Sequence, residues 1–171
     1  CDEGTRGGRR PLDRMTRRDA LSLGAALAVC YGAAAVGAQF APGPWYAQLS
    51  KPSWTPPGWV FAPVWTALYA MMAVAVWGVW RARATSQVVV LALCIFAVQL
   101  ILNTLWSWLF FGLRRADLAM LDIALLWCAI VATVIVFWRV RAWAGALLIP
   151  YLVWVSFAAM LNWRIWRLNA G

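Results

Sequence analysis

The chain has 171 residues, of which 64% are hydrophobic and only 12% are charged, and its formal net charge is +9. Soluble domains usually carry about 25% charged residues, so this composition excludes an ordinary soluble domain and favours a membrane protein. The positive charge does not indicate nucleic acid, because the arginines lie in the amino-terminal tail and at the ends of apolar stretches, where membrane topology explains them. We therefore expect no nucleic-acid partner.

Apolar stretches separated by charges and prolines divide the chain. A bilayer-spanning helix needs about 20 mostly apolar residues, and the stretches predict helices over about 20–41, 60–80, 87–112, 117–138 and 142–166. Every backbone group in the hydrocarbon must be hydrogen-bonded within a helix, so the predicted fold class is an all-α integral membrane protein, a five-transmembrane-helix bundle. One transmembrane domain, residues 20–169, takes up nearly the whole chain.

Residues 1–19 are basic and are predicted to form a disordered tail. The pair Arg17-Arg18 before an apolar run is typical of a twin-arginine signal. The run is longer than a usual signal core, so we expect a retained first helix. The chain begins with Cys1, and Met15 is an alternative true start.

The distribution of cations predicts the orientation of the bundle. With five spans, the tail arginines, Arg81, Arg83, Arg139 and Arg141 make ten cations on one side of the membrane, against five on the other. The positive-inside rule then places the amino terminus in the cytoplasm and the loop around Lys51 outside. Long apolar helices suit insertion into a bacterial inner membrane, which is the expected location.

Metal and acid–base chemistry have few candidate residues. Histidine is absent, and Cys1, Cys30, Cys94 and Cys128 lack the spacing of a metal site. Three of these cysteines fall in predicted helices, where we expect buried, unreactive thiols. Zinc chemistry, a Ser-His-Asp triad and histidine-ligated haem are excluded. We expect no bound metal, no required cofactor and no residue set for ground-state catalysis.

The segment between the first two predicted helices, residues 45–59, is dense in prolines and tryptophans. Pro52, Pro56 and Pro57 fix their own φ and restrict the residue before them, which disfavours helix and predicts a stiff, ordered lid. The tryptophans fit either this lid or an interfacial aromatic belt.

Side chains spaced by four recur in the second and third predicted helices. Phe61, Trp65 and Tyr69 share one face of the second helix, and Gln99 and Asn103 share one face of the third. The amides should face the protein interior, because an unpaired polar group facing lipid costs several kcal/mol. They serve either hydrogen bonding between helices or ligand binding.

The fifth predicted helix carries Trp154, Ala158 and Asn162 on one stripe, with the small Ala158 between two large polar-tipped neighbours. A small residue in this position makes either a close helix contact or a hole. Pro150 removes a backbone hydrogen bond, which predicts a kink beside Trp154.

In this order, the motifs resemble those of the tryptophan-rich sensory protein and translocator family (TspO/MBR, peripheral-type benzodiazepine receptor) from about Trp45 to Asn169. The residues that carry the resemblance are Trp45-Tyr46, Lys51-Pro52, Pro56-Pro57, Pro63-Val64-Trp65, Leu68-Tyr69, Gln99-Leu100, Asn103-Thr104-Leu105-Trp106, Phe110-Phe111-Gly112, Leu121-Asp122, Pro150-Tyr151-Leu152, Trp154, Leu161-Asn162, Trp166 and Arg167 to Asn169. The ordered set is far more specific than any one motif.

The resemblance implies a bundle, often dimeric, whose pocket beneath the first loop binds porphyrins such as protoporphyrin IX, haem precursors and other hydrophobic small molecules. Flat conjugated rings bind well between aromatic faces with a few polar anchors, which agrees with this implication. The residues that match ligand-contacting positions are Trp45, Trp65, Asn103, Trp154 and Ala158, and Tyr69 and Asn162, which share faces with them, complete the predicted ligand-binding set.

The leading functional hypothesis is a membrane receptor or sensor for porphyrins. Light-dependent breakdown of bound protoporphyrin is the one activity considered, with Trp65 and Trp154 exchanging an electron with the excited porphyrin. The alternative is a carrier that moves tetrapyrroles or sterol-like lipids across the membrane. Coupled carriers tend to hold ionisable groups inside the membrane, and Asp122 is the only obvious intramembrane charge.

Two weaker patterns concern lipid and self-association. The family's carboxyl-terminal sterol motif is degenerate here, since Leu161, Trp163 and Arg167 place Trp where the motif has Tyr. Sterol recognition is therefore doubtful, while Trp163 and Arg167 suit interfacial anchoring among membrane lipids. In the first helix, a small-residue strip, defined as Gly24, Ala28 and Gly32, suits close helix contact in a homodimer or scaffold.

Overall fold

The computed structural model describes residues 16–82 and 87–170, and all regular structure in these two segments is helical. Five helical spans are long and apolar enough to cross a membrane, as the sequence predicts. Their bounds are Arg17–Ala38, Gly58–Trp80, Gln87–Gly112, Ala116–Val140 and Ala142–Leu168.

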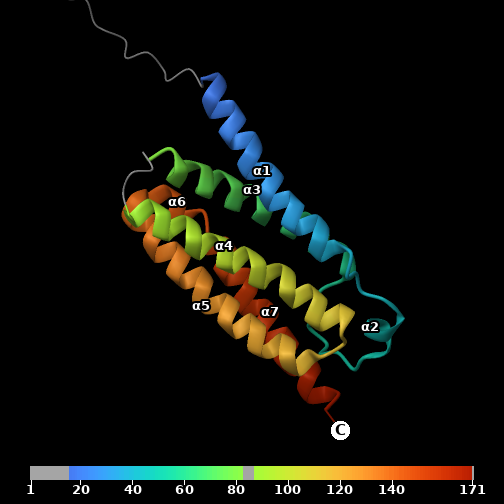
Figure 1. The fold of residues 1–171 in the computed structure, drawn as a ribbon. Coiled ribbons are helices and arrows are strands. Elements are labelled where there is room, and N and C mark those ends of the chain that lie inside the picture. The colour runs from blue at the N-terminus through green and yellow to red at the C-terminus, as the bar shows by residue number, and fades with distance from the viewer. Residues whose placement is uncertain (1–15, 83–86, 171) are drawn as a thin grey trace, which may run out of the picture.

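The helices form a bundle with one helix at its edge (Figure 1). In chain order they are α1 (Arg17–Ala38), α2 (Pro44–Gln48), η1 (Gly58–Val60), α3 (Phe61–Trp80), α4 (Gln87–Ser107), the π-helical turn η2 (Trp108–Gly112), α5 (Ala116–Val140), α6 (Ala142–Ala146) and α7 (Ile149–Leu168). Along the bundle α4 packs on α5 and α5 on α7, whereas α1 contacts only the α3 and α4 side extensively. The short α2 and the carboxyl terminus lie at the same end of the bundle.

Helix α1 begins three residues before the predicted bound, because a capping box starts it at Arg17. The Thr16 hydroxyl accepts the backbone N–H of Asp19 at 3.2 Å, and the Asp19 carboxylate accepts the backbone N–H of Thr16. This reciprocal pair satisfies two backbone donors that would otherwise be free at the helix start. The predicted tail bound at residue 19 is therefore wrong for Arg17, Arg18 and Asp19, and residues 1–15, with Cys1 and Met15, lie outside the described residues.

Helix α1 is also the least buried span, since Cys30 is its one fully buried residue. The small-residue strip is exposed, and a Cβ added at Gly24 or Gly32 would meet nothing within 4 Å. The strip therefore packs against no other described part of the chain. The expected burial of the thiols holds for Cys30, but it is wrong for the exposed Cys94 and Cys128.

At Pro150 the fifth span breaks into two helices instead of kinking. Helix α6 ends at Ala146, and α7 restarts at Ile149 with Pro150 in its first turn. Proline is tolerated there, because backbone N–H groups of a first helical turn have no partner within the helix. The break, at residues 147–148, therefore lies before the proline and not beside Trp154.

The end of the third span carries an irregularity that the sequence pattern did not indicate. After Ser107 the helix widens into the π-helical turn η2, and Phe110 becomes almost fully buried, with its ring stacked on Trp106 at 5.1 Å. The chain then reverses through Arg114, whose φ of 58° is in the left-handed region. Such π turns are frequent at functional sites and redirect side chains by one position.

The loop between α1 and α3 is ordered and pinned to the carboxyl terminus. The Ser50 backbone N–H donates to Asn169 Oδ1 at 3.0 Å, and Asn169 Nδ2 donates to the Ser50 carbonyl at 2.9 Å. The Lys51 ammonium donates to two nearby carbonyls and lies 4.8 Å from the Tyr46 ring centroid. Before these prolines, residues 44–48 form the short helix α2, whereas the sequence predicted no helix in this loop.

Candidate functional site

A chain of hydrogen bonds joins inward-facing side chains of α3, α4 and α7. Tyr69 Oη donates to Asn103 Oδ1 at 2.5 Å, and Asn103 Nδ2 donates to Tyr151 Oη at 2.9 Å. Tyr151 Oη in turn donates to Gln99 Oε1 at 3.0 Å, and Gln99 Nε2 approaches the Met72 sulfur at 3.9 Å. We call Tyr69, Gln99, Asn103 and Tyr151 the amide–tyrosine network. All four side chains are buried, so the network satisfies polar groups that would be costly in the membrane interior.

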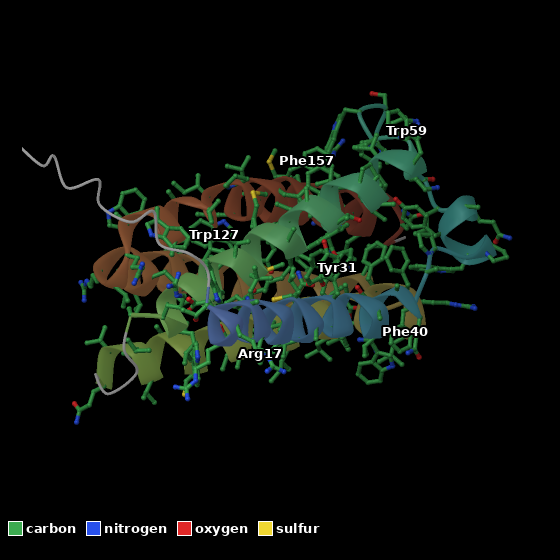
Figure 2. All side chains as sticks on the ribbon, turned by 90° about the horizontal axis from the view of Figure 1, so that it is seen from above. Arg17, Tyr31, Phe40, Trp59, Trp127 and Phe157 are labelled. Atoms are coloured by element: carbon green, nitrogen blue, oxygen red, sulfur yellow. The ribbon has the colours of Figure 1, made fainter. Side chains whose placement is uncertain are left out.

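Trp65 covers one end of this network. Its ring centroid lies 5.7 Å from that of Tyr69 and 6.2 Å from that of Tyr151. From the other side, Tyr31 of α1 approaches Tyr69 at 6.3 Å and donates its hydroxyl hydrogen to the Thr66 carbonyl. In Figure 2 the labelled Tyr31 points from α1 toward α3. The predicted residues Trp65, Tyr69 and Asn103 are thus brought together.

Trp154 belongs to a neighbouring aromatic cluster. Its ring lies 5.7 Å from Phe61 and 5.5 Å from Phe157, and Trp54 of the loop packs on Phe157 at 5.7 Å. The Trp154 indole nitrogen is buried and has no hydrogen-bond partner among the described residues. Buried donors are nearly always paired, so this one calls for an explanation. Trp59 of the same loop is 76% exposed and fits the interfacial belt instead.

A groove between α3 and α7 passes beside this cluster. It has a volume of about 710 Å³ and is lined by apolar side chains from both helices together with Trp154 and Phe157. A small-molecule site is usually a mostly apolar concavity with a few polar groups, and Trp154 is the one residue here with a free buried donor. Of the seven predicted ligand-binding residues, Trp154 alone lines this groove.

Trp45 and Asn162 lie in a third cluster, near the pinned loop. The Trp45 ring packs edge-on against Phe110 at 5.9 Å. Asn162 Oδ1 accepts the Trp106 indole N–H at 3.1 Å, and its Nδ2 donates to the Ala116 carbonyl at 2.9 Å. With both ends of its amide engaged and 1% of its surface exposed, Asn162 ties α7 to α4 and to the start of α5. Ala158 is half-buried and packs on the main core.

The predicted ligand-binding set therefore divides into three adjoining clusters. Sequence reasoning singled out Gln99 but missed the role of Tyr151, the residue that joins Asn103 to Gln99. The one sequence feature that could have indicated this role is the position of Tyr151 directly after Pro150. A proline there starts a helix, and a tyrosine in its first turn can reach across the bundle. Nothing in the sequence indicated Tyr31, which lies in an exposed helix.

Asp122 lies inside the bundle without a partner. It belongs to the second turn of α5, only 4% of its surface is exposed, and neither carboxylate oxygen has a hydrogen-bond partner among the described residues. Both of the ion pairs in the described structure involve other acids, Asp19 and Asp117. An unpaired acid within a membrane span is a functional candidate in its own right.

The degenerate sterol motif does not form one surface. Leu161 is 6% exposed and points into the core, whereas Trp163 is 45% exposed. Arg167 is exposed as well, one helical turn after Trp163. The outward pair suits an interfacial anchor, and Leu161 is separated from it by the helix itself.

These features define a class: a multi-pass helical membrane protein with buried amides and tyrosines, partly buried tryptophans and no cluster of three metal-ligating side chains in the described segments. The TspO/MBR family profile matches residues 25–167. Protein CrtK of Rhodobacter capsulatus is 44% identical over 142 residues, covering 83% of this chain and 89% of that protein. The tryptophan-rich sensory protein of Cereibacter sphaeroides is 41% identical, with coverages of 84% and 88%.

The similarity extends to animals. The translocator protein of Homo sapiens is 40% identical over 140 residues, covering 80% of this chain and 83% of that protein. The chain belongs to the TspO/MBR family. The resemblance identified from the sequence motifs is confirmed, and so is the all-α membrane fold.

Proposed function

We propose that the protein is a membrane receptor or sensor that binds porphyrins, such as protoporphyrin IX and haem precursors, and other hydrophobic ligands. Relatives named as sensory and translocator proteins support a role in sensing or transport. The ligand would lie against the aromatic clusters beneath the pinned loop, with Trp65 and Trp154 as its main ring contacts. Light-dependent breakdown of bound protoporphyrin belongs to this proposal: the two indoles exchange an electron with the excited ligand, and dissolved dioxygen is the oxidant that the ring opening requires.

The observation that carries the proposal is the unpaired indole N–H of Trp154 beside an apolar groove. A buried donor without a partner loses the free energy of one hydrogen bond, about 1–3 kcal/mol. A ligand with a carboxylate or carbonyl oxygen recovers that loss when it binds. Porphyrins combine such groups with a flat apolar ring that packs well on indole and phenyl faces.

Replacing Trp154 by phenylalanine is expected to weaken binding of protoporphyrin IX about 5- to 150-fold, because an aromatic ring is kept while the roughly 1–3 kcal/mol that the ligand recovers at the indole N–H is lost. The measurement is saturable quenching of tryptophan fluorescence in detergent. Trp163→Phe is the matched control, since it also removes one tryptophan, from an exposed position. Quenching that does not saturate, or that both variants weaken equally, would indicate detergent partitioning.

The same titration under illumination, followed by porphyrin absorbance, tests the light-dependent breakdown of bound protoporphyrin.

The second candidate is a carrier for tetrapyrroles or sterol-like lipids, and the buried, unpaired carboxyl of Asp122 favours it. A carboxyl group buried within a membrane span is the kind of group that takes up a proton or cation from one side of a membrane and releases it on the other. If the protein is a carrier, Asp122→Asn reduces porphyrin uptake into proteoliposomes at least tenfold and leaves binding in detergent unchanged. Equal uptake by wild type and Asp122→Asn would remove this argument for a carrier.

We propose a bacterial inner-membrane location with the amino terminus in the cytoplasm, on the basis of the cation distribution. The Asp19–Arg81 ion pair, with a distance of 2.8 Å, puts the start of α1 and the end of α3 at the same membrane face. Protease accessibility in oriented vesicles tests this orientation.

We also propose that the small-residue strip mediates a homodimer. Gly32→Leu should reduce dimerisation while leaving the thermal unfolding of the monomer unchanged, because a Cβ at Gly32 meets nothing within 4 Å. Chemical cross-linking in micelles reports the dimer, and circular dichroism reports unfolding. A loss of stability without a loss of dimer would contradict the proposal.

A further inference from the structure

A second and larger groove runs along the outer face of α1 and α4, and the end of α3 joins its lining near the start of α1 through Val76, Trp77 and Trp80. Its volume is about 1180 Å³, and none of the predicted ligand-binding residues lines it. Within α1 it extends from Arg18 to Val36, and Phe40 just after the helix also lines it; at 1.5 Å per residue the span from Arg18 to Phe40 is about 33 Å. The hydrocarbon core of a bilayer is about 30 Å thick, so the groove is as long as the membrane is deep.

Only the end of the groove near the start of α1 carries charge. We call this end of the groove, lined by Arg18, Ser22, Trp77 and Trp80, the mouth. The rest of the lining is almost wholly apolar. Trp80 is 53% exposed, as expected of a residue at the level of the lipid headgroups.

The acid at this mouth is already neutralised. The carboxylate of Asp19 forms an ion pair with Arg81 at 2.8 Å and also caps α1. Arg81 in turn stacks over Trp77 at 4.9 Å, and the Trp77 indole N–H donates to Ser22 Oγ at 3.1 Å. These contacts fix Asp19 and Arg81 together, so the charges of Arg17 and Arg18 remain uncompensated in the described structure. The mouth is therefore complementary to an anion.

We propose that the half of this groove next to Arg18 is a binding site for one anionic phospholipid. The phosphate pairs with the Arg18 guanidinium, and an acyl chain lies between α1 and α4 along Val29 and Ala97. Basic pockets between membrane helices typically bind anionic headgroups, at about 1 kcal/mol per cation. A second copy of the chain fits the mouth less well, because a copy related by a twofold axis along the membrane normal would bring its own Arg18 to the same level of the membrane, where the two like charges repel.

Native mass spectrometry of the full chain in detergent tests the site, with palmitoyl-oleoyl phosphatidylglycerol compared with phosphatidylcholine of the same chains. The wild-type monomer should retain one phosphatidylglycerol in preference to phosphatidylcholine. Arg18→Gln should weaken this binding about fivefold. Arg17→Gln, which removes the same charge from a side chain outside the groove lining, should change it less than twofold.

A variant that fills the groove separates a built site from general attraction to charge. Ala97 is exposed and lines the groove, so phenylalanine there should exclude the acyl chain without disturbing the core. Val98→Phe, at the neighbouring exposed position outside the lining, is the control. Equal lipid retention by wild type, Arg18→Gln and Ala97→Phe would overturn the proposal. So would an Ala97→Phe effect on the dimer fraction with unchanged lipid on the monomer.

Discussion

Asn103→Ala is expected to lower the free energy of unfolding by about 2–3 kcal/mol. The substitution removes the acceptor of the Tyr69 hydroxyl and the donor to Tyr151, both of which are buried. A buried polar group left unpaired costs about 1–3 kcal/mol, and single hydrogen bonds between membrane helices contribute about 0.6–1.7 kcal/mol. Reversible unfolding by denaturing detergent, followed by circular dichroism, measures the loss.

Ser107→Ala is the matched control for that experiment. Ser107 lies one turn further along the same face of α4, and its side chain makes no hydrogen bond to the described residues, so the expected change is below about 0.5 kcal/mol. Equal losses in the two variants would show that the network contributes nothing specific. A loss of porphyrin affinity in Asn103→Ala without a loss of stability would instead favour Asn103 as a direct ligand contact.

The spans were predictable from the sequence because the bilayer imposes length and hydropathy on each helix independently. Their ends were less predictable, since short-range hydrogen bonds set them. The Thr16–Asp19 capping box starts α1 before its apolar run, and the proline at 150 permits a restart of the helix where a kink was expected. The π-helical turn at 108–112 depends on tertiary packing of Phe110 and has no periodicity signal.

The candidate site was predictable as a set of residue types but not as an arrangement. Spacing by four correctly puts Trp65 and Tyr69 on one face, where their rings lie 5.7 Å apart. Spacing says nothing about which helix faces which, so the partner that engages Asn103, namely Tyr151 from the break region of the last span, could not be identified. Residue roles that depend on contacts between helices need the tertiary structure.

The structure also separates two apolar grooves that the sequence does not distinguish. The groove at α3 and α7 borders the aromatic clusters and carries the free donor of Trp154. The groove at α1 and α4 carries its polar feature at the mouth, as the Arg18 guanidinium. An internal donor suits a ligand that enters the protein, whereas a cation at the headgroup level suits a lipid that remains in the bilayer.

Gly145→Ala is expected to lower the free energy of unfolding by about 1–3 kcal/mol. A Cβ at position 145 would lie 2.9 Å from the backbone nitrogen of Trp138 and 3.0 Å from its Cα, so the backbone of α5 or α6 would have to move. At Gly78 the same substitution meets the Trp143 ring, whose half-exposed side chain moves more easily than a backbone does. Gly78→Ala should therefore lower the free energy of unfolding by less than Gly145→Ala does.

Gly24→Ala is the control that makes this comparison specific. It is the same chemical change within a helix, but a Cβ at Gly24 meets nothing within 4 Å. Alanine favours helix over glycine by about 0.5–1 kcal/mol, so Gly24→Ala should leave stability unchanged or raise it. Unfolding of the variants in one detergent gives the order directly. If Gly145→Ala is as stable as Gly24→Ala, the close approach of α6 to the end of α5 does not constrain the fold, and the break before Pro150 owes its position to the proline alone.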